Sequence, residues 1–238
     1  MKIACWSGPR NISTALMRSW SSRNDTAVID EPFYAYYLKK KNLKHPLYRE
    51  IINHYPHRYS DVVKSINKEN PNLKKIWYQK HMAHHVVDLE NIQWITNFKN
   101  CFLIRNPKNV ISSYIKKNEL NNVEELGYPQ QLSLLKYLLK KNKNFIVIDS
   151  TDLLKNPQKL LKIWCSHLKI EFQDRMLSWE KGKHISDGIW AEHWYGNIIN
   201  SNKFHAFKDK SISLSNDYKL IYDNAMHYYD KLNEFIDY

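Results

Sequence analysis

A loop rich in hydroxyl groups follows the first apolar segment of the chain. Residues 7–14 read Ser-Gly-Pro-Arg-Asn-Ile-Ser-Thr, between an apolar run at residues 3–6 and a helix-like run at residues 15–20. A tight turn from a buried strand into a helix start presents backbone N–H groups, hydroxyls and a guanidinium to one anion. The pattern predicts a phosphate-binding loop. Taken alone, it equally fits a plain turn with Ser13 or Thr14 as N-cap.

The loop departs from the Walker pattern G-x-x-x-x-G-K-[ST]. When the final hydroxyl is aligned on Thr14, Ser7, Ile12 and Ser13 stand where the two glycines and the lysine would be. Arg10 is the only cation of the loop and is displaced from the lysine position. This disfavours an NTPase that uses Mg²⁺ and a γ-phosphate, although a kinase or nucleotide hydrolase stays as an alternative.

A second segment, residues 101–114, has a similar layout. Its apolar run ends in Arg105, and Pro107 suits the first turn of a following helix, which would carry Ser113. An arginine fork and a serine hydroxyl can bind a phosphate together. The structural alternative is an ion pair of Arg105 with an acidic neighbour and packing of Ser113.

Together the two segments resemble the bacterial, P-loop-type branch of the sulfotransferases that use 3′-phosphoadenosine 5′-phosphosulfate (PAPS). The resemblance implies that the first loop binds the 5′-phosphosulfate and that Arg105 and Ser113 bind the 3′-phosphate. Residues 30–34, 148–157 and 187–204 also look like elements of this family, in the family's order. The residues expected at the cofactor are Gly8, Pro9, Arg10, Asn11, Ile12, Ser13, Thr14, Arg105, Ser113, Trp194, Ser201 and Phe204.

Two positions depart from the family pattern. Many members have glycine where Ile12 stands, and a Cβ keeps the backbone farther from an anion. Some members have an aromatic residue at Ala15 that stacks on adenine, so this stacking must come from Trp190, Trp194 or Phe204. One base–aromatic stack is worth roughly 1–3 kcal/mol, so its loss would weaken cofactor binding without abolishing it.

Sulfuryl transfer needs a base for the proton of the acceptor and a cation for the leaving phosphate. We expect Arg10 to stabilise the charge on the bridging oxygen. Glu31 directly follows the second apolar run, in a location similar to that of glutamate bases in related enzymes. His81 follows the third run, similar to the Lys-x-His of the cytosolic members, although here Lys80 and His81 are adjacent. We favour Glu31 over His81 as the base.

The histidines at residues 81, 84 and 85 also permit a zinc site, because two imidazoles one turn apart can bind the ion. No cysteine or carboxylate at a typical spacing completes the ligand set, so we expect no metal. The chain has three cysteines, Cys5, Cys101 and Cys165, an odd number that lacks the spacing of metal ligands. This pattern is typical of a protein of the reducing cytoplasm. We expect neither a signal peptide nor a transmembrane segment, because no stretch approaches the ~20 apolar residues that span a bilayer.

The chain of 238 residues carries 36 Lys and Arg against 24 Asp and Glu, a net charge of +12. This excess favours a polyanionic ligand and leaves open a non-catalytic protein that binds nucleotides or nucleic acid. No nucleic-acid module is recognisable, so we expect no nucleic-acid partner. The 8 Trp and 16 Tyr suggest a partly apolar or sugar-like acceptor surface, although most of these rings belong in a core.

Apolar runs alternate with helical patterns along the chain, which predicts an α/β fold with a parallel sheet of about five strands in a P-loop-type three-layer domain over residues 1–238. The expected strands cover residues 2–6, 26–30, 74–79, 100–105 and 144–148, and the expected helices cover residues 13–23, 107–117, 128–141, 157–168 and 214–236. Right-handed crossovers place the carboxyl ends of all strands at one edge, where such sheets bind ligands. Residues 33–70 and 170–213 would cover that edge. The predicted function is transfer of a sulfuryl group from PAPS to a hydroxyl or amine of a small or medium-sized acceptor.

Overall fold

A five-stranded parallel sheet forms the centre of the computed structural model, which describes residues 1–208 and 211–238. The strand order is β2-β3-β1-β4-β5, and all neighbours are parallel. This sheet confirms the predicted α/β class. The strands are β1(Lys2–Ser7), β2(Thr26–Asp30), β3(Ile76–Met82), β4(Lys99–Ile104) and β5(Phe145–Asp149).

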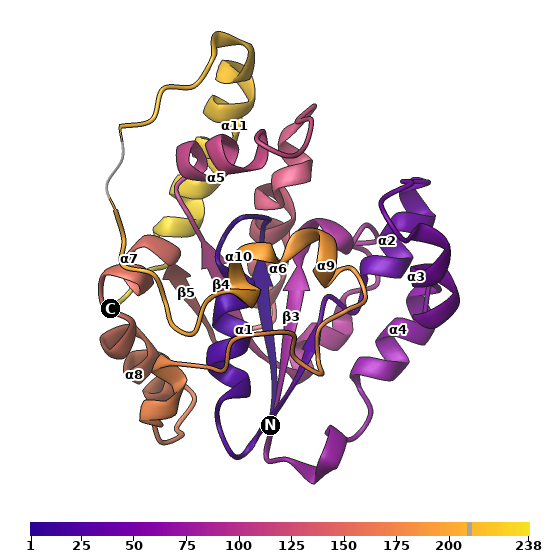
Figure 1. Cartoon of the computed structure of the whole chain (residues 1–238), viewed down its shortest axis with the longest axis vertical. Coiled ribbons are helices and arrows are strands. Elements are labelled where there is room, and N and C mark those ends of the chain that lie inside the picture. The colour runs from indigo at the N-terminus through magenta and orange to yellow at the C-terminus, as the bar shows by residue number, and fades with distance from the viewer. Residues whose placement is uncertain (209–210) are drawn as a thin grey trace.

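Helices cover both faces of the sheet and complete three layers (Figure 1). On one face, α1(Ser13–Ser21) and α8(Pro157–His167) pack through a core in which Trp20 and Trp164 meet edge to face. The opposite face is covered by α5(Pro107–Tyr114), α6(Tyr128–Lys140) and α11(Lys219–Asn233). The C-terminal helix is therefore shorter than the predicted span of residues 214–236.

The two long segments outside this frame are largely helical or irregular. Residues 33–70 contain α2(Tyr34–Lys41), α3(Tyr48–His54) and α4(Tyr59–Ile66). The segment of residues 170–213 contains α9(Ala191–Trp194) and α10(Gly196–Ile199). Outside both segments, α7(Ser150–Lys155) follows β5 directly. In Figure 1, α9 and α10 lie toward the arrowhead ends of the strands, while the N-terminus lies at the other end. Short 3₁₀ turns occupy Pro71–Leu73, Ala83–His85, Gln93–Asn97, Val123–Leu126, Asp174–Leu177 and Asn216–Tyr218.

Local sequence explains why helices start directly after the strands. Asn106 caps α5 by accepting a hydrogen bond from the backbone N–H of Lys108, and Pro107 occupies the first helical position. Asn156 and Pro157 repeat this arrangement at the start of α8. Proline has no N–H to leave unpaired in the first turn, and an asparagine oxygen satisfies one of the free donors there. The cap at Asn106 thus fixes where the chain turns after β4, and the cap at Asn156 fixes where α8 starts after α7.

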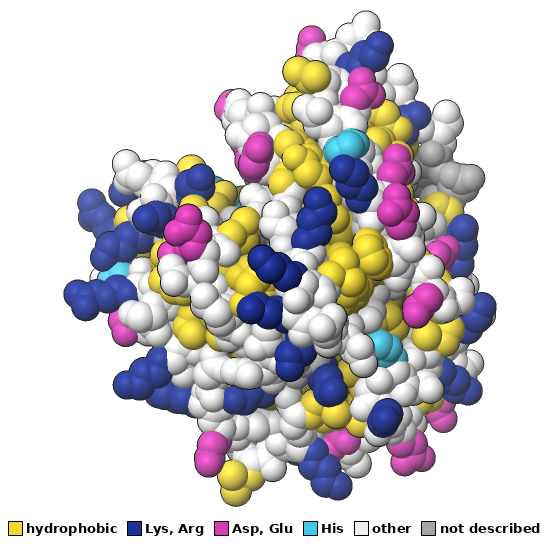
Figure 2. Space-filling model, turned by 180° about the vertical axis from the view of Figure 1, so that it is seen from behind, with side chains coloured by type: hydrophobic (Ala, Val, Ile, Leu, Met, Phe, Trp, Pro, Cys, Tyr) yellow, Lys and Arg dark blue, Asp and Glu magenta, His cyan; other side chains and the backbone are white. Residues whose placement is uncertain are grey.

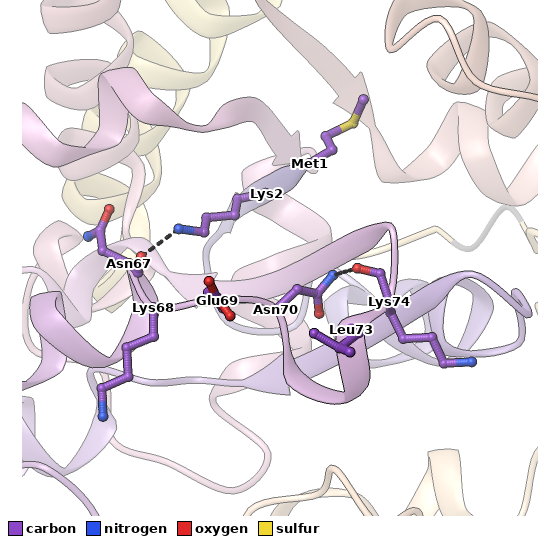
Figure 3. Close-up of a pocket in the computed structure, with 8 residues that line it drawn as sticks. All are labelled: Met1, Lys2, Asn67, Lys68, Glu69, Asn70, Leu73 and Lys74. Carbon is purple, nitrogen blue, oxygen red and sulfur yellow. Dashed lines mark hydrogen bonds between the residues drawn. The ribbon is translucent and has the colours of Figure 1, made fainter.

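The surface charge is spread widely. Figure 2 shows Lys and Arg over the whole of one face, with Asp and Glu among them. At the amino ends of the strands lies an open hollow of about 470 Å³, bordered by the first residues of β1 and by residues 67–74 (Figure 3). The Nζ of Lys2 donates to the carbonyl of Asn67 there. Among the described helices, none is long and apolar enough to cross a membrane.

Gly8 provides a test of how tightly the first loop is packed. A Cβ on Gly8 would lie 2.1 Å from the carbonyl oxygen of Leu126, a backbone atom that cannot move independently. We expect Gly8→Ala to lower the free energy of unfolding by about 1–3 kcal/mol, as overpacking does. Urea unfolding followed by circular dichroism measures this change.

Gly196→Ala is the matched control, because a Cβ at Gly196 meets no atom within 4 Å. At this helical position, alanine should be neutral or stabilise the protein by up to about 1 kcal/mol. Equal unfolding midpoints for Gly8→Ala and the wild type would contradict the packing described.

Candidate active site

A cleft of about 390 Å³ opens at the carboxyl edge of the sheet. It brings together the first loop, the ends of β2, β3 and β4, the last turn of α5 and the segment from Trp194 to His205. Of the residues predicted for the site, those that line the cleft are Pro9, Arg10, Ile12, Ser13, Thr14, Glu31, Arg105, Ser113, Trp194, Ser201 and Phe204. Gly8, Asn11 and His81 do not line it.

The first loop is held in an unusual backbone conformation. Arg10 and Ile12 have φ of 62° and 58°, in the left-handed region that favours glycine. Neighbouring elements fix the loop: Nη1 of Arg105 donates to the carbonyl of Arg10 at 2.7 Å, and the Ser150 hydroxyl donates to the carbonyl of Asn11 at 3.0 Å. Ile12 keeps its side chain against the core beside α1. Packing and hydrogen bonds therefore hold a turn that the residue types alone would disfavour.

Gly8 and Asn11 have structural positions in this loop. Gly8 allows the close approach of the Leu126 carbonyl, and Asn11 is 1% exposed and donates from Nδ2 to the carbonyl of Leu103 at 3.1 Å. A buried amide that donates to a strand carbonyl anchors the loop to β4. The structure thus places both residues beneath the cleft, in contrast to the expectation that they contact the cofactor.

The two arginines form the positive end of the cleft. Nε of Arg10 donates to the Ser113 hydroxyl at 2.9 Å, so the first loop and α5 meet as predicted. Burial lowers the pKa of both Arg10 and Arg105, but a guanidinium remains charged in proteins. No salt bridge to either arginine occurs within residues 1–208 and 211–238. Among the described residues, the site therefore holds two positive charges without a carboxylate in salt-bridge contact.

The start of α1 adds to the positive electrostatic character of this end of the cleft. Its N-cap, Ile12, offers no side chain to the free backbone N–H groups of the first turn. The first intrahelical bond runs from the N–H of Leu16 to the carbonyl of Ile12, and Ser13 and Thr14 line the cleft before it. Free N–H groups and the positive end of the helix dipole favour an anion. This end of the cleft fits a phosphate or sulfate group.

Across the cleft lies a cluster of one lysine and two carboxylates. Nζ of Lys80 lies 2.9 Å from Oδ1 of Asp30 and 2.6 Å from Oε1 of Glu31. The hydroxyl of Tyr195 donates to Oδ2 of Asp30 at 2.7 Å and lies 2.6 Å from Lys80 Nζ. Burial raises the pKa of Asp30, although Lys80 opposes this effect. Burial alone would lower the pKa of Lys80, but the two carboxylates outweigh it and raise the pKa.

Within this cluster, Glu31 is the carboxylate that lines the cleft. Its backbone has φ of 41°, and its N–H donates to the carbonyl of Lys80 at 2.9 Å, so the chain turns sharply at the end of β2. Lys80 holds Oε1, while Oε2 lies 3.9 Å from Nδ1 of His85. Glu31 is thus oriented with one oxygen on the lysine and the other toward His85.

His81 lies on the other side of the sheet. Successive side chains of a strand point to opposite faces, so Lys80 and His81 cannot both reach the cleft. The imidazole of His81 is 1% exposed and stacks on Trp6, with ring centroids 4.5 Å apart. Burial lowers the pKa of His81 to about 3. The structure therefore places His81 in the core, out of reach of an acceptor in the cleft.

Several residues of the cleft escaped the sequence analysis. Tyr34, His45, Tyr114 and Asn118 line it, and Tyr195 contacts both carboxylates. Tyr34 and Tyr195 belong to stretches that look like family elements, but their aromatic character alone is typical of a core. His45 lies between α2 and α3, where nothing in the sequence indicates a site.

The other predicted features concern metals and thiols. Across the described ranges, no group of three or more His, Cys, Asp or Glu side chains is arranged to hold a metal ion. His84 and His85 line the cleft. Cys5, Cys101 and Cys165 are free thiols, and all three are buried.

Comparison with known proteins gives a family and a fold for this chain. Residues 1–234 match the family described as "Sulfotransferase domain". Among solved structures, the chain is similar to the "Sulfotransferase Domain from the Curacin Biosynthetic Pathway", with a TM-score of 0.58 and 17% identity over 99% of this chain and 98% of that one. It is also similar to the "Sulfotransferase Domain from the Synechococcus PCC 7002 Olefin Synthase", with a TM-score of 0.55 and 16% identity over 97% and 94% of the two chains. At these identities the likeness concerns the fold.

Curated relatives are found in Arabidopsis thaliana. The chain is 34% identical over 202 residues to "Branched-chain-amino-acid aminotransferase-like protein 2", which covers 85% of this chain and 36% of the relative. The same identity holds over 206 residues of "Branched-chain-amino-acid aminotransferase-like protein 1", 87% of this chain and 37% of the relative. The chain therefore spans little more than a third of the length of these relatives.

The burial of His81 predicts a pH-dependent stability. The pKa of His81 falls from 6.5 to about 3 on folding, so between these values the unfolded state binds a proton that the native state does not. The free energy of unfolding should therefore fall as the pH drops from 6.5 toward 3, by up to about 1.4 kcal/mol per pH unit from this group. His81→Phe, which keeps a ring beside Trp6, should make this slope shallower by up to that amount. Urea unfolding at pH 7, 6, 5 and 4 measures it.

His227→Gln, at an exposed position of α11, serves as the control and should leave the slope unchanged. A slope in His81→Phe that equals the wild-type slope would show that His81 is not buried in its neutral form.

Proposed function

Because the chain belongs to the sulfotransferase domain family, we propose that it transfers the sulfuryl group of PAPS to a hydroxyl or amine of a small or medium-sized acceptor. One observation carries the proposal: Arg10 and Arg105 face the same cleft, and among the described residues neither is paired with a carboxylate. A nucleotide with phosphate groups at two positions supplies the negative charges that can pair with these two arginines.

Each part of the cleft has a proposed role. Arg10, Ser13 and Thr14, together with the free N–H groups of α1, hold the 5′-phosphosulfate, and Arg105 and Ser113 hold the 3′-phosphate. Trp194, Ser201 and Phe204 lie on the segment that covers the cleft and contact the adenosine. Bound PAPS supplies the sulfuryl group, and 3′,5′-bisphosphoadenosine is left after transfer. Pro9 and Ile12 complete the wall of this half.

Glu31 is the proposed base. Its carboxylate lines the cleft and takes the proton of the acceptor oxygen or nitrogen, while Lys80 keeps it oriented at 2.6 Å. Arg10 stabilises the charge that develops on the bridging oxygen of the donor. His81 has no place in this scheme, because its ring lies in the core beside Trp6.

A kinase or nucleotide hydrolase has less support. The loop contains no lysine, and Lys80 is bound between two carboxylates and a tyrosine hydroxyl. The aminotransferase in the names of the Arabidopsis relatives belongs to much longer proteins, and no part of the proposal depends on it.

We also propose the cytoplasm as the compartment, in keeping with the three free cysteines.

The first experiment measures binding of 3′,5′-bisphosphoadenosine by calorimetry, beside 5′-AMP and ATP with Mg²⁺. We expect bisphosphoadenosine to bind at least tenfold more tightly than 5′-AMP, because only it carries the 3′-phosphate. Arg105→Ala should weaken bisphosphoadenosine binding by about 10- to 100-fold, since hydrogen bonds to charged groups are each worth about 1.5–3 kcal/mol.

Arg49→Ala is the control, since Arg49 is exposed on α3. It should bind bisphosphoadenosine as the wild type does. Tighter binding of ATP with Mg²⁺ than of bisphosphoadenosine would overturn the proposal in favour of a kinase or hydrolase.

The role of Glu31 is tested by turnover. Glu31→Gln keeps the shape and a contact for Lys80 but removes the base, so transfer from ³⁵S-labelled PAPS to a mixture of phenols, alcohols and amines should fall by about 10²–10⁴-fold. Affinity for bisphosphoadenosine should change less than threefold. Glu50→Gln, on exposed α3, is the matched control. Turnover of Glu31→Gln within threefold of the wild type would rule out Glu31 as the base.

A further inference from the structure

The hydroxyl of Tyr195 reaches the proposed base from a distant part of the chain. Tyr195 directly follows α9 in the segment that covers the cleft, whereas Asp30, Glu31 and Lys80 lie at the ends of β2 and β3. Tyr195 is 6% exposed, so its hydroxyl cannot rely on water for hydrogen bonds. A buried tyrosine hydroxyl usually finds a partner in the protein, and the partners of Tyr195 indicate what it does.

The hydrogen-bonding capacity of this hydroxyl is used within the cluster. It donates to Oδ2 of Asp30 at 2.7 Å, and Oε1 of Glu31 is a second acceptor at 3.1 Å. It accepts from Nζ of Lys80 at 2.6 Å and from Nε1 of Trp190 at 3.3 Å. Burial, and then the charges of Asp30 and Glu31, raise the pKa of Tyr195 well above its ordinary value, so the hydroxyl keeps its hydrogen. With its donor and acceptor sites occupied, Tyr195 supports the cluster and does not itself take a proton from an acceptor.

The ammonium of Lys80 is saturated as well. An ammonium has three hydrogens to donate. Its three acceptors are Oδ1 of Asp30 at 2.9 Å, Oε1 of Glu31 at 2.6 Å and the hydroxyl of Tyr195 at 2.6 Å. Because Lys80 is 1% exposed, water cannot replace an acceptor that is lost. Without the hydroxyl, one buried N–H would have no partner, which is costly, so the ammonium would shift toward another acceptor.

The position of Glu31 depends on that of Lys80. Lys80 binds Oε1 of Glu31 and thereby determines where the second carboxylate oxygen, Oε2, lies. The sheet supplies Asp30 and Lys80 as register partners, but the third contact of the ammonium comes from the segment that covers the cleft. Misplacement of a catalytic group by about 1 Å can cost about 100-fold in rate. The contact from Tyr195 is therefore relevant to the chemistry of the cleft as well as to its packing.

We propose that Tyr195 is a positioning residue for the base: its hydroxyl holds the ammonium of Lys80, which in turn holds the carboxylate of Glu31. The base is then correctly placed only when the segment of Tyr195 lies over the cleft. This inference rests on the proposed function and adds a residue that acts through Glu31. The same segment has a separate anchor, the 2.6 Å ion pair of Asp187 with Arg18, which remains when the hydroxyl of Tyr195 is removed.

Tyr195→Phe removes the hydroxyl and keeps the ring, whose centroid lies 4.8 Å from Nζ of Lys80. At saturating ³⁵S-labelled PAPS and a fixed mixture of phenols, alcohols and amines, we expect the rate of transfer to fall by about 10- to 100-fold. The KM for PAPS and the affinity for 3′,5′-bisphosphoadenosine should change less than threefold. A rate within threefold of the wild type would overturn the inference, and so would an equal loss of rate and of bisphosphoadenosine affinity.

Tyr229→Phe is the matched control. The hydroxyl of Tyr229 also donates to a carboxylate at the end of a strand, Oδ2 of Asp149 at 2.9 Å, but it has no contact with Lys80 or Glu31. This variant should keep the rate of transfer within twofold of the wild type. An equal loss of rate in Tyr229→Phe and Tyr195→Phe would mean that any buried tyrosine hydroxyl has this effect, and it would contradict a specific role of Tyr195.

A double variant separates action through Glu31 from a general effect on the fold. If Tyr195 acts through Glu31, adding Tyr195→Phe to Glu31→Gln should lower the remaining rate of transfer less than twofold further. A purely structural role would give the same fold-loss with and without the Glu31 carboxylate, and that result would exclude a positioning role.

Crystal structures of the wild type and of Tyr195→Phe test the geometry without any acceptor. In the variant, we expect Nζ of Lys80 to lie beyond about 3.5 Å from Oε1 of Glu31, or Glu31 to occupy a second conformer, with the Arg18–Asp187 pair intact. An unchanged Glu31 would refute the inference, as would a wild-type structure in which the Tyr195 hydroxyl does not contact Lys80. Absence of transfer by the wild type would defeat the proposed function itself, while the two structures would still show whether Tyr195 determines the position of Glu31.

Discussion

The structure of the cleft depends on the ion pairs of Lys80. Asp30 and Lys80 are register partners on neighbouring strands, so the sheet itself brings the carboxylate and the ammonium together. Both side chains are 1% exposed, which makes each of them costly to bury without its partner. Glu31 and Tyr195 complete the set of hydrogen bonds around the ammonium. The proposed base, Glu31, is therefore held by a group that the fold must retain for its own stability.

Contacts from the ends of other strands also hold the first loop of the chain. Arg10 and Ile12 adopt left-handed backbone angles at a cost of roughly 1–2 kcal/mol each for residues other than glycine. The loop keeps this shape because Arg105 and Ser150 bind its carbonyls from the ends of two other strands. Arg105 thus belongs both to the anion site and to the support of the loop. A parallel sheet makes this possible, since all strand ends meet at one edge.

Much of the fold and part of the site could be predicted from the sequence. The apolar runs predict strand positions within two or three residues of those observed, and the meeting of the first loop with the segment that carries Arg105 and Ser113 follows from two loops at one sheet edge. The position of His81 could not be read from its neighbours, because a shift of one residue moves a side chain to the other face of a strand. Asn11 likewise looks like a ligand by type but anchors the loop to β4. The positions of Tyr34 and Tyr114 in the cleft could not be predicted, because an aromatic residue that lines a cleft and one that packs in a core look alike in the sequence.

The segment that covers the cleft is part of the site as well as its cover. Asp187, at its start, forms a 2.6 Å ion pair with Arg18 of α1, and both side chains are at least 94% buried. Tyr195, further along, binds the carboxylates of Asp30 and Glu31 at the end of β2. Between and beyond these anchors the segment contributes Trp194 and Phe204 to the lining of the cleft. One segment thus contacts both α1, the helix that follows the first loop, and Glu31, the proposed base. Because both anchors are buried ion pairs or hydrogen bonds to charged groups, displacement of the segment would leave the buried charges of Arg18 and Asp30 without these partners, which favours the arrangement in which the segment covers the cleft.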